Sequence, residues 1–331
     1  MKQKHRKRTE VLTGKNALQS DINQPWEQDN QAWWDWYVTL AENNGTQRAK
    51  LCVRPEFPSV ELPTDDEIFE EIKKPFFLNR QNLEQFRRDG FIKLKNIFST
   101  GAIIRLRNEA LKLLAEFYNT KLDGGEQDRF LSLEMVWLNN PLIRSFVLSK
   151  RIAKICAELL NVRNVRLYHD NILSKEPGCG RTPWHYDDHH FPLATDDVIT
   201  AWIPAQPIPL EMGPLTFAKP LNVFELVKSI KFNKFDTSYD RQISQIFLEN
   251  QVSIEESAFA IGEVSFHHNR SFHTAGPNNT NQSRIVLATT YYADGARVLK
   301  QPTMVSGDWQ KFIPNTAPGD PAATEYNPIC W

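Results

Sequence analysis

Two histidines, one aspartate and one arginine form the pattern in this chain that most clearly indicates chemistry. His185 and Asp187 are separated by a single residue, and His273 and Arg284 follow much later. Two imidazoles and a carboxylate that leave other coordination positions open are the ligand set of non-haem Fe(II) oxygenases. An arginine near such a set can hold the carboxylate of a co-substrate in a two-pronged hydrogen bond. The pattern therefore predicts oxidation chemistry at iron.

The spacing of these residues requires β-strands to bring them together. Side chains two positions apart on a strand point to the same side, so His185 and Asp187 on one strand can bind one metal ion while Tyr186 points away. His273 follows a β-like run and precedes the run that begins at Arg284. Adjacent strands of a jelly roll would bring it opposite the first pair. The pair alone is a weak signal because it needs only two residues, and the later histidine and arginine strengthen it.

Other histidines compete for the metal. His189 and His190 directly follow the pair, and we expect them at a strand end, beside the ligands or facing the substrate. His267 and His268 precede the loop that carries the later histidine, and they would bind metal only if that histidine did not. His169 is expected to be a core or pocket histidine whose hydrogen bonds are satisfied.

The first part of the chain is polar and carries few regular patterns. Residues 1–30 show no clear period and predict a loose tail. Aromatic residues crowd together at 33–40, which favours an amphipathic helix lying on the main domain, with a substrate lid as the alternative. Three prolines at 53–65 indicate an extended linker.

Helical patterns follow. A helix that contains Leu83 is expected to stop at Asp89-Gly90, and the next residues favour a strand at Phe91–Leu94. Residues 102–118 show the clearest helical period, with apolar residues on one face and polar ones, Arg107 among them, mostly elsewhere. Residues 141–160 predict further helix.

Short β-like runs separated by turn residues dominate the chain from Val165 onward. Their number predicts a mainly β or α+β fold, a β-sandwich or jelly roll with a helical layer supplied by the first half of the chain. Residues 221–258 interrupt the runs and predict a helical insertion near the mouth of the site. The expected runs are Val165–Tyr168, Asn171–Ser174, Val198–Trp202, Gly213–Phe217, Glu263–His267 and Arg284–Tyr292.

Composition narrows the classes of partner and compartment. The chain has 331 residues with a net charge of −1, so no overall field favours nucleic acid. It contains no apolar run long enough to cross a membrane and no apolar stretch after the basic start that would form a secretory signal. Its 4 cysteines are scattered and indicate reduced thiols. We therefore expect a cytoplasmic protein without nucleic-acid or membrane partners, a monomer or weak homo-oligomer.

Four stretches of this sequence resemble the phytanoyl-CoA dioxygenase family of Fe(II)/2-oxoglutarate oxygenases. The resemblance runs from about Leu83 to the C-terminus, and order and spacing agree. It implies a double-stranded β-helix, the cupin-like form of the jelly roll, with helices packed on one sheet. The stretches are FRRDGFIKLKNIFS, LSKEPGCGRTPWHYDD, TAWIPAQPIPLEMGPLTFAKP and GEVSFHHNRSFHTAGPNNTNQSRIVLATTYYADG.

The resemblance implies a ligand set and a co-substrate clamp. It assigns His185, Asp187 and His273 as iron ligands, because the last ligand of the family precedes an AGPN-like turn. Arg284 is similar to the residue that holds the distal carboxylate of 2-oxoglutarate. Fe(II), 2-oxoglutarate and O2 are thus the implied cofactor and co-substrates.

Further positions line the implied co-substrate site. Asn171 and Trp202 align with positions that face 2-oxoglutarate. Lys175 matches the lysine of a KxPG stretch, and no direct role is assigned to it. The chain departs from the family at Ala275, where some members carry a serine that contacts the co-substrate, and Thr274 or Asn171 is expected to compensate.

The implied reaction is oxidation of an unactivated C–H bond of a small molecule, with hydroxylation first and desaturation or oxidative cyclisation as further outcomes. Halogenases of this superfamily replace the ligand carboxylate by a small residue, so Asp187 argues against halogenation. A specialised metabolite is the favoured substrate. The alternatives are an acyl-CoA hydroxylase of lipid catabolism and a non-catalytic or 2-oxoglutarate-independent metal protein. The expected organisation is an N-terminal extension at 1–78 and an oxygenase domain at 79–331.

Overall fold

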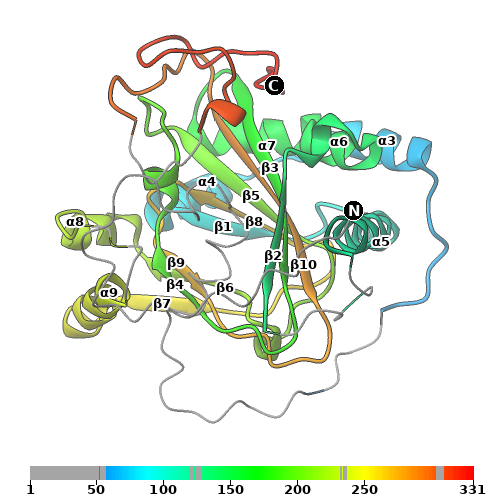
Figure 1. The fold of residues 1–331 in the computed structure, drawn as a ribbon, viewed down its shortest axis with the longest axis horizontal. Coiled ribbons are helices and arrows are strands. Elements are labelled where there is room, and N and C mark those ends of the chain that lie inside the picture. Colours follow the sequence, from blue (N-terminus) through cyan, green and yellow to red (C-terminus); the bar gives the residue numbers. More distant parts are fainter. Residues whose placement is uncertain are drawn as a thin grey trace, which may run out of the picture.

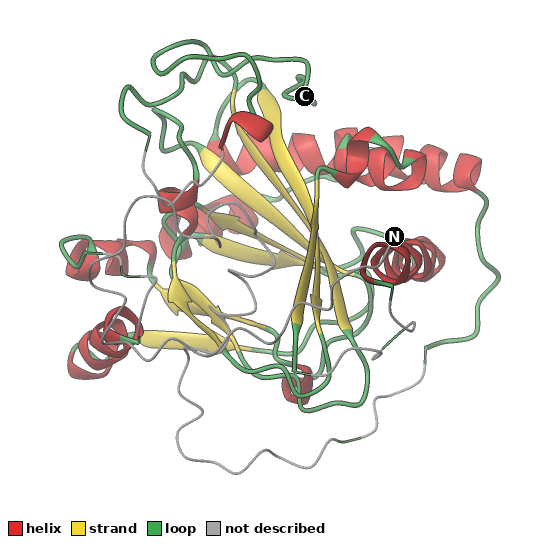
Figure 2. Ribbon diagram, in the orientation of Figure 1, coloured by secondary structure: helices red, strands yellow, loops and turns green. Residues whose placement is uncertain are grey.

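The computed structural model describes residues 52, 57–119, 123, 128–231, 233, 237–302 and 309–331. The expected tail at 1–30 and the aromatic helix at 33–40 lie outside these residues. Within them, the strands form one sheet of six strands and one of four, and every strand-to-strand ladder is antiparallel. The strands gather in the middle of the molecule, with helices on the flanks (Figure 2).

The larger sheet has the strand order β1-β8-β5-β10-β3-β2, and the smaller sheet has the order β4-β9-β6-β7. This pair of sheets is the double-stranded β-helix that the resemblance implied, so the predicted fold class is confirmed. The strands are β1 Phe91–Leu94, β2 Phe130–Glu134, β3 Val165–Lys175, β4 Thr182–His185, β5 Val198–Pro204, β6 Leu215–Lys219, β7 Ser253–Glu256, β8 Val264–His268, β9 His273–Ala275 and β10 Arg284–Ala293.

Helices flank the sheets on two sides (Figure 1). Four of them, α3, α5, α6 and α7, gather beside the larger sheet, while α8 and α9 lie at the opposite side, next to the smaller sheet. The helices are α3 Asp65–Lys73, α4 Arg80–Asp89, α5 Thr100–Tyr118, α6 Pro141–Val147, α7 Lys150–Leu160, α8 Phe224–Val227 and α9 Ser238–Glu249.

The helix boundaries follow from local chemistry. Helix α4 ends at Gly90, whose φ of 79° lies in the left-handed region that glycine adopts without strain, as the Asp89-Gly90 pair predicted. The region predicted as helix at 141–160 is two helices. The side chain of Ser149 accepts a hydrogen bond from the backbone N–H of Ile152 and begins α7, because a serine hydroxyl satisfies a free N–H at a helix start better than it fits a helix interior.

Alternation along the strands divides the larger sheet into two faces. Ile172, Ile203 and Leu287 pack with the helices in the main hydrophobic core. Their neighbours on the other face, such as Trp202 and Val286, pack with residues of the smaller sheet in a second apolar cluster. The space between the sheets is therefore lined by alternate residues of each strand, and any side chain on that inner face is screened from water.

Two details of the prediction need correction. The two expected runs at 165–174 are one strand, β3, whose pairing with β10 shifts between Thr290 and Tyr291, so one extra residue of β3 bulges out of the ladder. Arg107 does not lie on the exposed side of α5: it is 3% exposed. It contacts Gln206 and donates to Asp123 at 2.8 Å, and these partners offset the cost of burying its charge.

The interrupting segment at 221–258 holds α8, α9 and the edge strand β7 among its described residues, and its identity as an insertion near the mouth of the site stays a prediction. Its apolar side chains pack under Trp184, Tyr186 and Phe272, which directly neighbour the candidate metal residues. At the other end of the chain, α3 contributes Ile68 and Ile72 to the main core, although it precedes the expected domain boundary at 78/79. That boundary stays a prediction. No helix in the described part of the chain is long and apolar enough to span a membrane.

Gly213 provides a test of this packing. It has a φ of 70°, and a Cβ there would overlap with the carbonyl oxygen of Gly276, next to β9. Gly295 also has a positive φ, 94°, but a Cβ there meets nothing within 4 Å. Both Gly→Ala changes add backbone strain, and only Gly213→Ala adds a clash, so we expect it to lower the free energy of unfolding by about 1–3 kcal/mol more than Gly295→Ala. Equal losses in urea titrations of the two variants would contradict the close approach.

Candidate metal centre

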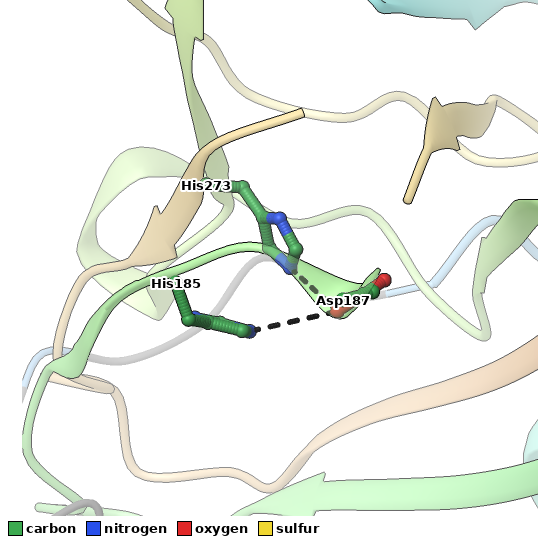
Figure 3. Close-up of side chains that lie close together, drawn as sticks. All are labelled: His185, Asp187 and His273. Atoms are coloured by element: carbon green, nitrogen blue, oxygen red, sulfur yellow. Dashed lines mark ion pairs between the residues drawn. The ribbon is translucent and has the colours of Figure 1, made fainter. Parts of the chain in front are cut away.

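The pairing of β4 with β9 brings the two histidines together. His185, the last residue of β4, lies directly across from His273, the first residue of β9. With Asp187 they form a group whose candidate ligand atoms all lie within 4.8 Å of one another. The Oδ1 atom of Asp187 is 4.0 Å from Nε2 of His185 and 3.7 Å from Nε2 of His273. Figure 3 shows both rings directed at this carboxylate, so one ion between them could contact all three residues.

The sequence predicted that Asp187 lies on the same strand as His185. In the structure, the strand β4 ends at His185 and does not include Asp187. Asp187 begins a short 3-10 helix, Asp187–His190, after an extended Tyr186. The reason is a backbone contact: the N–H groups of Asp187 and Asp188 both donate to the carbonyl of Asn269, at 2.8 and 3.0 Å, and this turns the chain off β4. Tyr186 does point away, as expected, and its ring packs 4.9 Å from that of Phe272.

Backbone carbonyls fix the orientation of the two histidine rings. Nδ1 of His185 lies 2.8 Å from the carbonyl oxygen of Pro183, and Nδ1 of His273 lies 3.0 Å from that of Ser271. A carbonyl only accepts, so each Nδ1 carries the proton and each Nε2 presents its lone pair to the centre. This arrangement is typical of histidines that bind a metal through Nε2.

Burial sets the charges of the group. It lowers the pKa of His185 and of His273 below the usual histidine value, so both rings are neutral at pH 7. Burial by itself would raise the pKa of Asp187, but the surrounding imidazoles outweigh it and hold that pKa well below its usual range. Two neutral imidazoles and one carboxylate are the protonation states that a divalent cation requires.

Arg284, the first residue of β10, is a buried cation on the inner face. It is 2% exposed, and burial lowers its pKa to about 10. One terminal nitrogen donates to the carbonyl of Gly213 at 2.5 Å, whereas its Nε has no hydrogen-bond partner among the described residues. Its guanidinium carbon lies 5.4 Å from the ring centroid of Trp202. In the described part of the chain no carboxylate pairs with it, so the position can receive an anion from outside.

The buried start of β10 is held from the helical side. Gln206 accepts from the N–H of Ile285 at 3.1 Å and donates to the carbonyl of Ser283 at 2.9 Å, so it fixes the backbone on both sides of Arg284. Lys175 lies across from Arg284 on β3 and is fully buried. It donates to the carbonyl oxygen of Gly276 at 2.7 Å, which ties the turn after β9 to the larger sheet.

The other expected co-substrate residues divide into two groups. Asn171 and Trp202 lie across β10 from one another, each paired with Ala288, on the inner face. Asn171 accepts from the hydroxyl of Ser132 at 2.9 Å. Thr274 does not join them, because it follows His273 on β9 and faces the other way. Its hydroxyl donates to the carbonyl of Thr182.

The competing histidines also have definite places. His189 packs its ring 3.7 Å from that of Tyr186, and His169 stacks on Phe312 at 4.7 Å. In contrast to the expectation for His169, its Nδ1 has no hydrogen-bond partner among the described residues. His267 contacts the carboxylate of Asp187, and the sequence, which indicated this histidine only as an alternative metal ligand, did not predict the contact. Thr200 was missed entirely, although its position two residues before Trp202 on one strand already predicted an inner-face side chain.

Comparisons with known proteins agree with this geometry. A model of the family "Phytanoyl-CoA dioxygenase (PhyH)" matches residues 86–220, which include the HxD pair and end before the later histidine and arginine. A probable alpha-ketoglutarate-dependent hypophosphite dioxygenase from Stutzerimonas stutzeri is 22% identical over 228 residues, which cover 62% of this chain and 76% of the relative.

Solved structures share the fold. The non-haem alpha-ketoglutarate-dependent carbocyclase SnoK from nogalamycin biosynthesis superposes with a TM-score of 0.63 at 22% identity, over 77% of this chain and 99% of SnoK. EctD from S. alaskensis superposes with a TM-score of 0.58 at 17% identity, over 76% of this chain and 91% of EctD. At these identities the likeness establishes the fold.

The fold and the facial group of two histidines and one carboxylate define the class of this protein: it is an Fe(II)/2-oxoglutarate-dependent oxygenase, with iron as cofactor and 2-oxoglutarate as co-substrate. Within that class, residues 86–220 of this chain match the model of the phytanoyl-CoA dioxygenase family.

The neutral state of the buried histidines leads to a prediction for metal binding. At pH 6, two solvated histidines with pKa values near 6.5 carry together about 1.5 protons on the nitrogens that a metal would bind, and metal binding would release these protons. Because burial lowers the pKa of His185 and His273, we expect clearly fewer protons than this to be released per ion. Calorimetric titration with Co(II), in buffers of different ionisation enthalpy, measures this number. A release near 1.5 would show that the rings are protonated before the metal arrives.

Proposed function

We propose that this protein oxidises an unactivated C–H bond of a small molecule, with His185, Asp187 and His273 as iron ligands and Arg284 as the clamp for 2-oxoglutarate. Hydroxylation is the favoured outcome, with desaturation or oxidative cyclisation as related ones. Succinate and CO2 are the co-products. The observation that carries the proposal is that a candidate metal-binding carboxylate and a buried arginine, which has no acidic partner among the described residues, both lie at the inner face of the larger sheet.

The residues of the centre fit iron through their donor set. Two Nε2 atoms and one carboxylate oxygen converge from three short segments, and these three residues would hold the ion. Three protein ligands leave three positions on a six-coordinate iron. When bound, iron and 2-oxoglutarate together use O2 to supply the oxidant that removes hydrogen from the substrate. The protein's own contribution is to hold the ligands in their neutral and anionic forms and to exclude water.

Arg284 supports 2-oxoglutarate as the second reactant. A guanidinium buried without an acidic partner is unfavourable unless a bound anion completes it. Its Nε and terminal nitrogens form the planar fork that matches a carboxylate. Trp202 covers the guanidinium from one side, so the arginine is held in place before the co-substrate arrives.

The identity of the substrate rests on weaker support. SnoK is a carbocyclase from nogalamycin biosynthesis, and an EctD structure contains 2-oxoglutarate and 5-hydroxyectoine. These likenesses favour a small specialised metabolite. We also expect a cytoplasmic monomer or weak homo-oligomer, which the 4 unpaired cysteines support.

The structure gives less support to the acyl-CoA alternative. The basic residues of the helical layer that could meet the CoA phosphates are Arg144, Lys150 and Arg151. Arg144 donates instead to the carbonyl oxygen of Trp137 at 2.8 Å, and Arg151 donates to the carbonyls of Lys74 at 2.7 Å and Ile97 at 2.5 Å. Both side chains therefore hold the helical layer together. A non-catalytic role would not account for the complete ligand set, or for an Arg284 that has no acidic partner in the described part of the chain.

Arg284→Ala tests the clamp. Truncation leaves the co-substrate carboxylate unpaired in a buried place, at a cost of about 2–5 kcal/mol. We therefore expect the apparent KM for 2-oxoglutarate to rise at least about 30-fold, at 1.4 kcal/mol per decade, while Co(II) affinity stays as in the wild type. Arg297→Ala is the matched control, because that arginine is exposed and its side chain donates to the backbone carbonyl of Gly319, away from the inner face. An unchanged KM in Arg284→Ala would remove the clamp from the proposal.

The reaction type is tested by the products of the iron-loaded protein. Wild-type protein, loaded with Fe(II) without air, is mixed with 2-oxoglutarate, chloride buffer and a panel of small metabolites and acyl-CoA thioesters, and O2 is then admitted. We expect succinate to form with at least one metabolite, and mass spectrometry to show a gain of one oxygen or a loss of two hydrogens. Asp187 occupies the place that a halide would need, so a chlorine isotope pattern in the wild-type product would contradict the assignment.

A further inference from the structure

The two oxygens of Asp187 face different partners. Oδ1 lies toward the Nε2 atoms of His185 and His273, at 4.0 and 3.7 Å. Oδ2 lies 3.2 Å from Nε2 of His267 and 3.4 Å from the hydroxyl of Thr200. One oxygen is therefore directed at the candidate metal position and the other at the inner face of the larger sheet.

His267 is placed for this contact by β8. It is 2% exposed and pairs directly with Thr200 on β5, so both side chains stand next to each other on the inner face. A carboxylate oxygen only accepts, so the contact requires the proton of His267 to be on Nε2. Its Nδ1 has no hydrogen-bond partner among the described residues, which leaves Oδ2 of Asp187 as the recorded partner of the ring.

This contact matters because Asp187 is outside the β-ladder. Its backbone is fixed by one hydrogen bond to Asn269, but its carboxylate can still rotate. A rotated carboxylate could bind an ion through both oxygens and take a position that the co-substrates need. His267 is also close enough to compete: its ring centroid lies 4.7 Å from that of His273. A proton on Nε2 prevents both outcomes, because it engages Oδ2 and leaves Nε2 with no lone pair for the metal.

We propose that His267 is a positioning residue that, together with Thr200, restricts Asp187 to ligation through Oδ1. The inference rests on the proposed iron site and adds to it the reason for one-oxygen ligation. Partners that orient a metal ligand typically contribute about 10–100-fold to metal affinity. Loss of His267 should therefore weaken metal binding and change the coordination, while the fold is kept by the β8 ladders on both sides.

The first test compares three variants by calorimetry and by the visible absorption of bound Co(II), which reports coordination number. His267→Phe keeps a ring and removes the donor, and we expect about 10–100-fold weaker binding with an altered spectrum. His267→Gln retains an N–H donor and should restore most of the affinity and the wild-type spectrum. His268→Phe changes the next residue, which points away from the inner face, and should match the wild type. Thermal melts establish that each variant is folded.

The second test needs no variant and so remains decisive if His267→Phe does not fold. Nitrogen-15 NMR of the histidine-labelled, metal-free wild type distinguishes the two neutral tautomers. We expect His267 to carry its proton on Nε2, and His185 and His273 to carry theirs on Nδ1.

The inference is overturned if His267 carries its proton on Nδ1, if His267→Phe binds Co(II) with wild-type affinity and spectrum, or if His267→Gln is as impaired as His267→Phe. A failure of the iron site itself looks different. In that case His185→Ala would bind Co(II) as tightly as the wild type, whatever the result at His267.

Discussion

The ionised carboxylate of Asp187, enclosed between two sheets, is the constraint on which the rest of the site depends. Burying a charge is costly unless it is hydrogen-bonded or paired. Here His267 and Thr200 compensate one oxygen, Oδ2, whereas Oδ1 faces the lone pairs of the His185 and His273 Nε2 atoms. The β4–β9 pairing that brings His185 opposite His273 therefore creates a place where three electron-pair donors converge and a cation is needed to balance them. A divalent cation bound to Oδ1 and the two Nε2 atoms would supply this balance.

Arg284 places a positive charge on the same inner surface. Its guanidinium is buried, fixed by Gly213 and covered by Trp202, and in the described part of the chain no acid balances it. The inner surface thus carries one anionic group, Asp187, and one cationic group, Arg284, which do not form an ion pair with each other. A metal ion satisfies the first and the distal carboxylate of a 2-oxo acid satisfies the second. These two charges destabilise the fold in the absence of ligands. Binding of the cofactor and the co-substrate compensates them and is therefore more favourable.

Sequence reasoning predicted much of this because its strongest signals were periodic or fixed by turns. Strand alternation and the late position of His273 predicted the facing ligands, and Asp89-Gly90 predicted a helix end. It placed Asp187 on a strand, since a carbonyl from distant Asn269 that turns the chain has no local signature. It likewise left Arg107 with the polar residues of α5, because its partner Gln206 is far away in sequence. Tertiary contacts between distant residues decided each of these cases.

The central claim is that one ion binds to Nε2 of His185, Oδ1 of Asp187 and Nε2 of His273, with His267 bonded to Oδ2 and outside the coordination sphere. Anomalous diffraction at the iron edge, from crystals of the protein loaded with Fe(II) and 2-oxoglutarate without air, tests this most directly. The account predicts a single iron peak within bonding distance of those three atoms, with the distal carboxylate of 2-oxoglutarate against Arg284. An iron peak bonded to His267, or to both oxygens of Asp187, would contradict it.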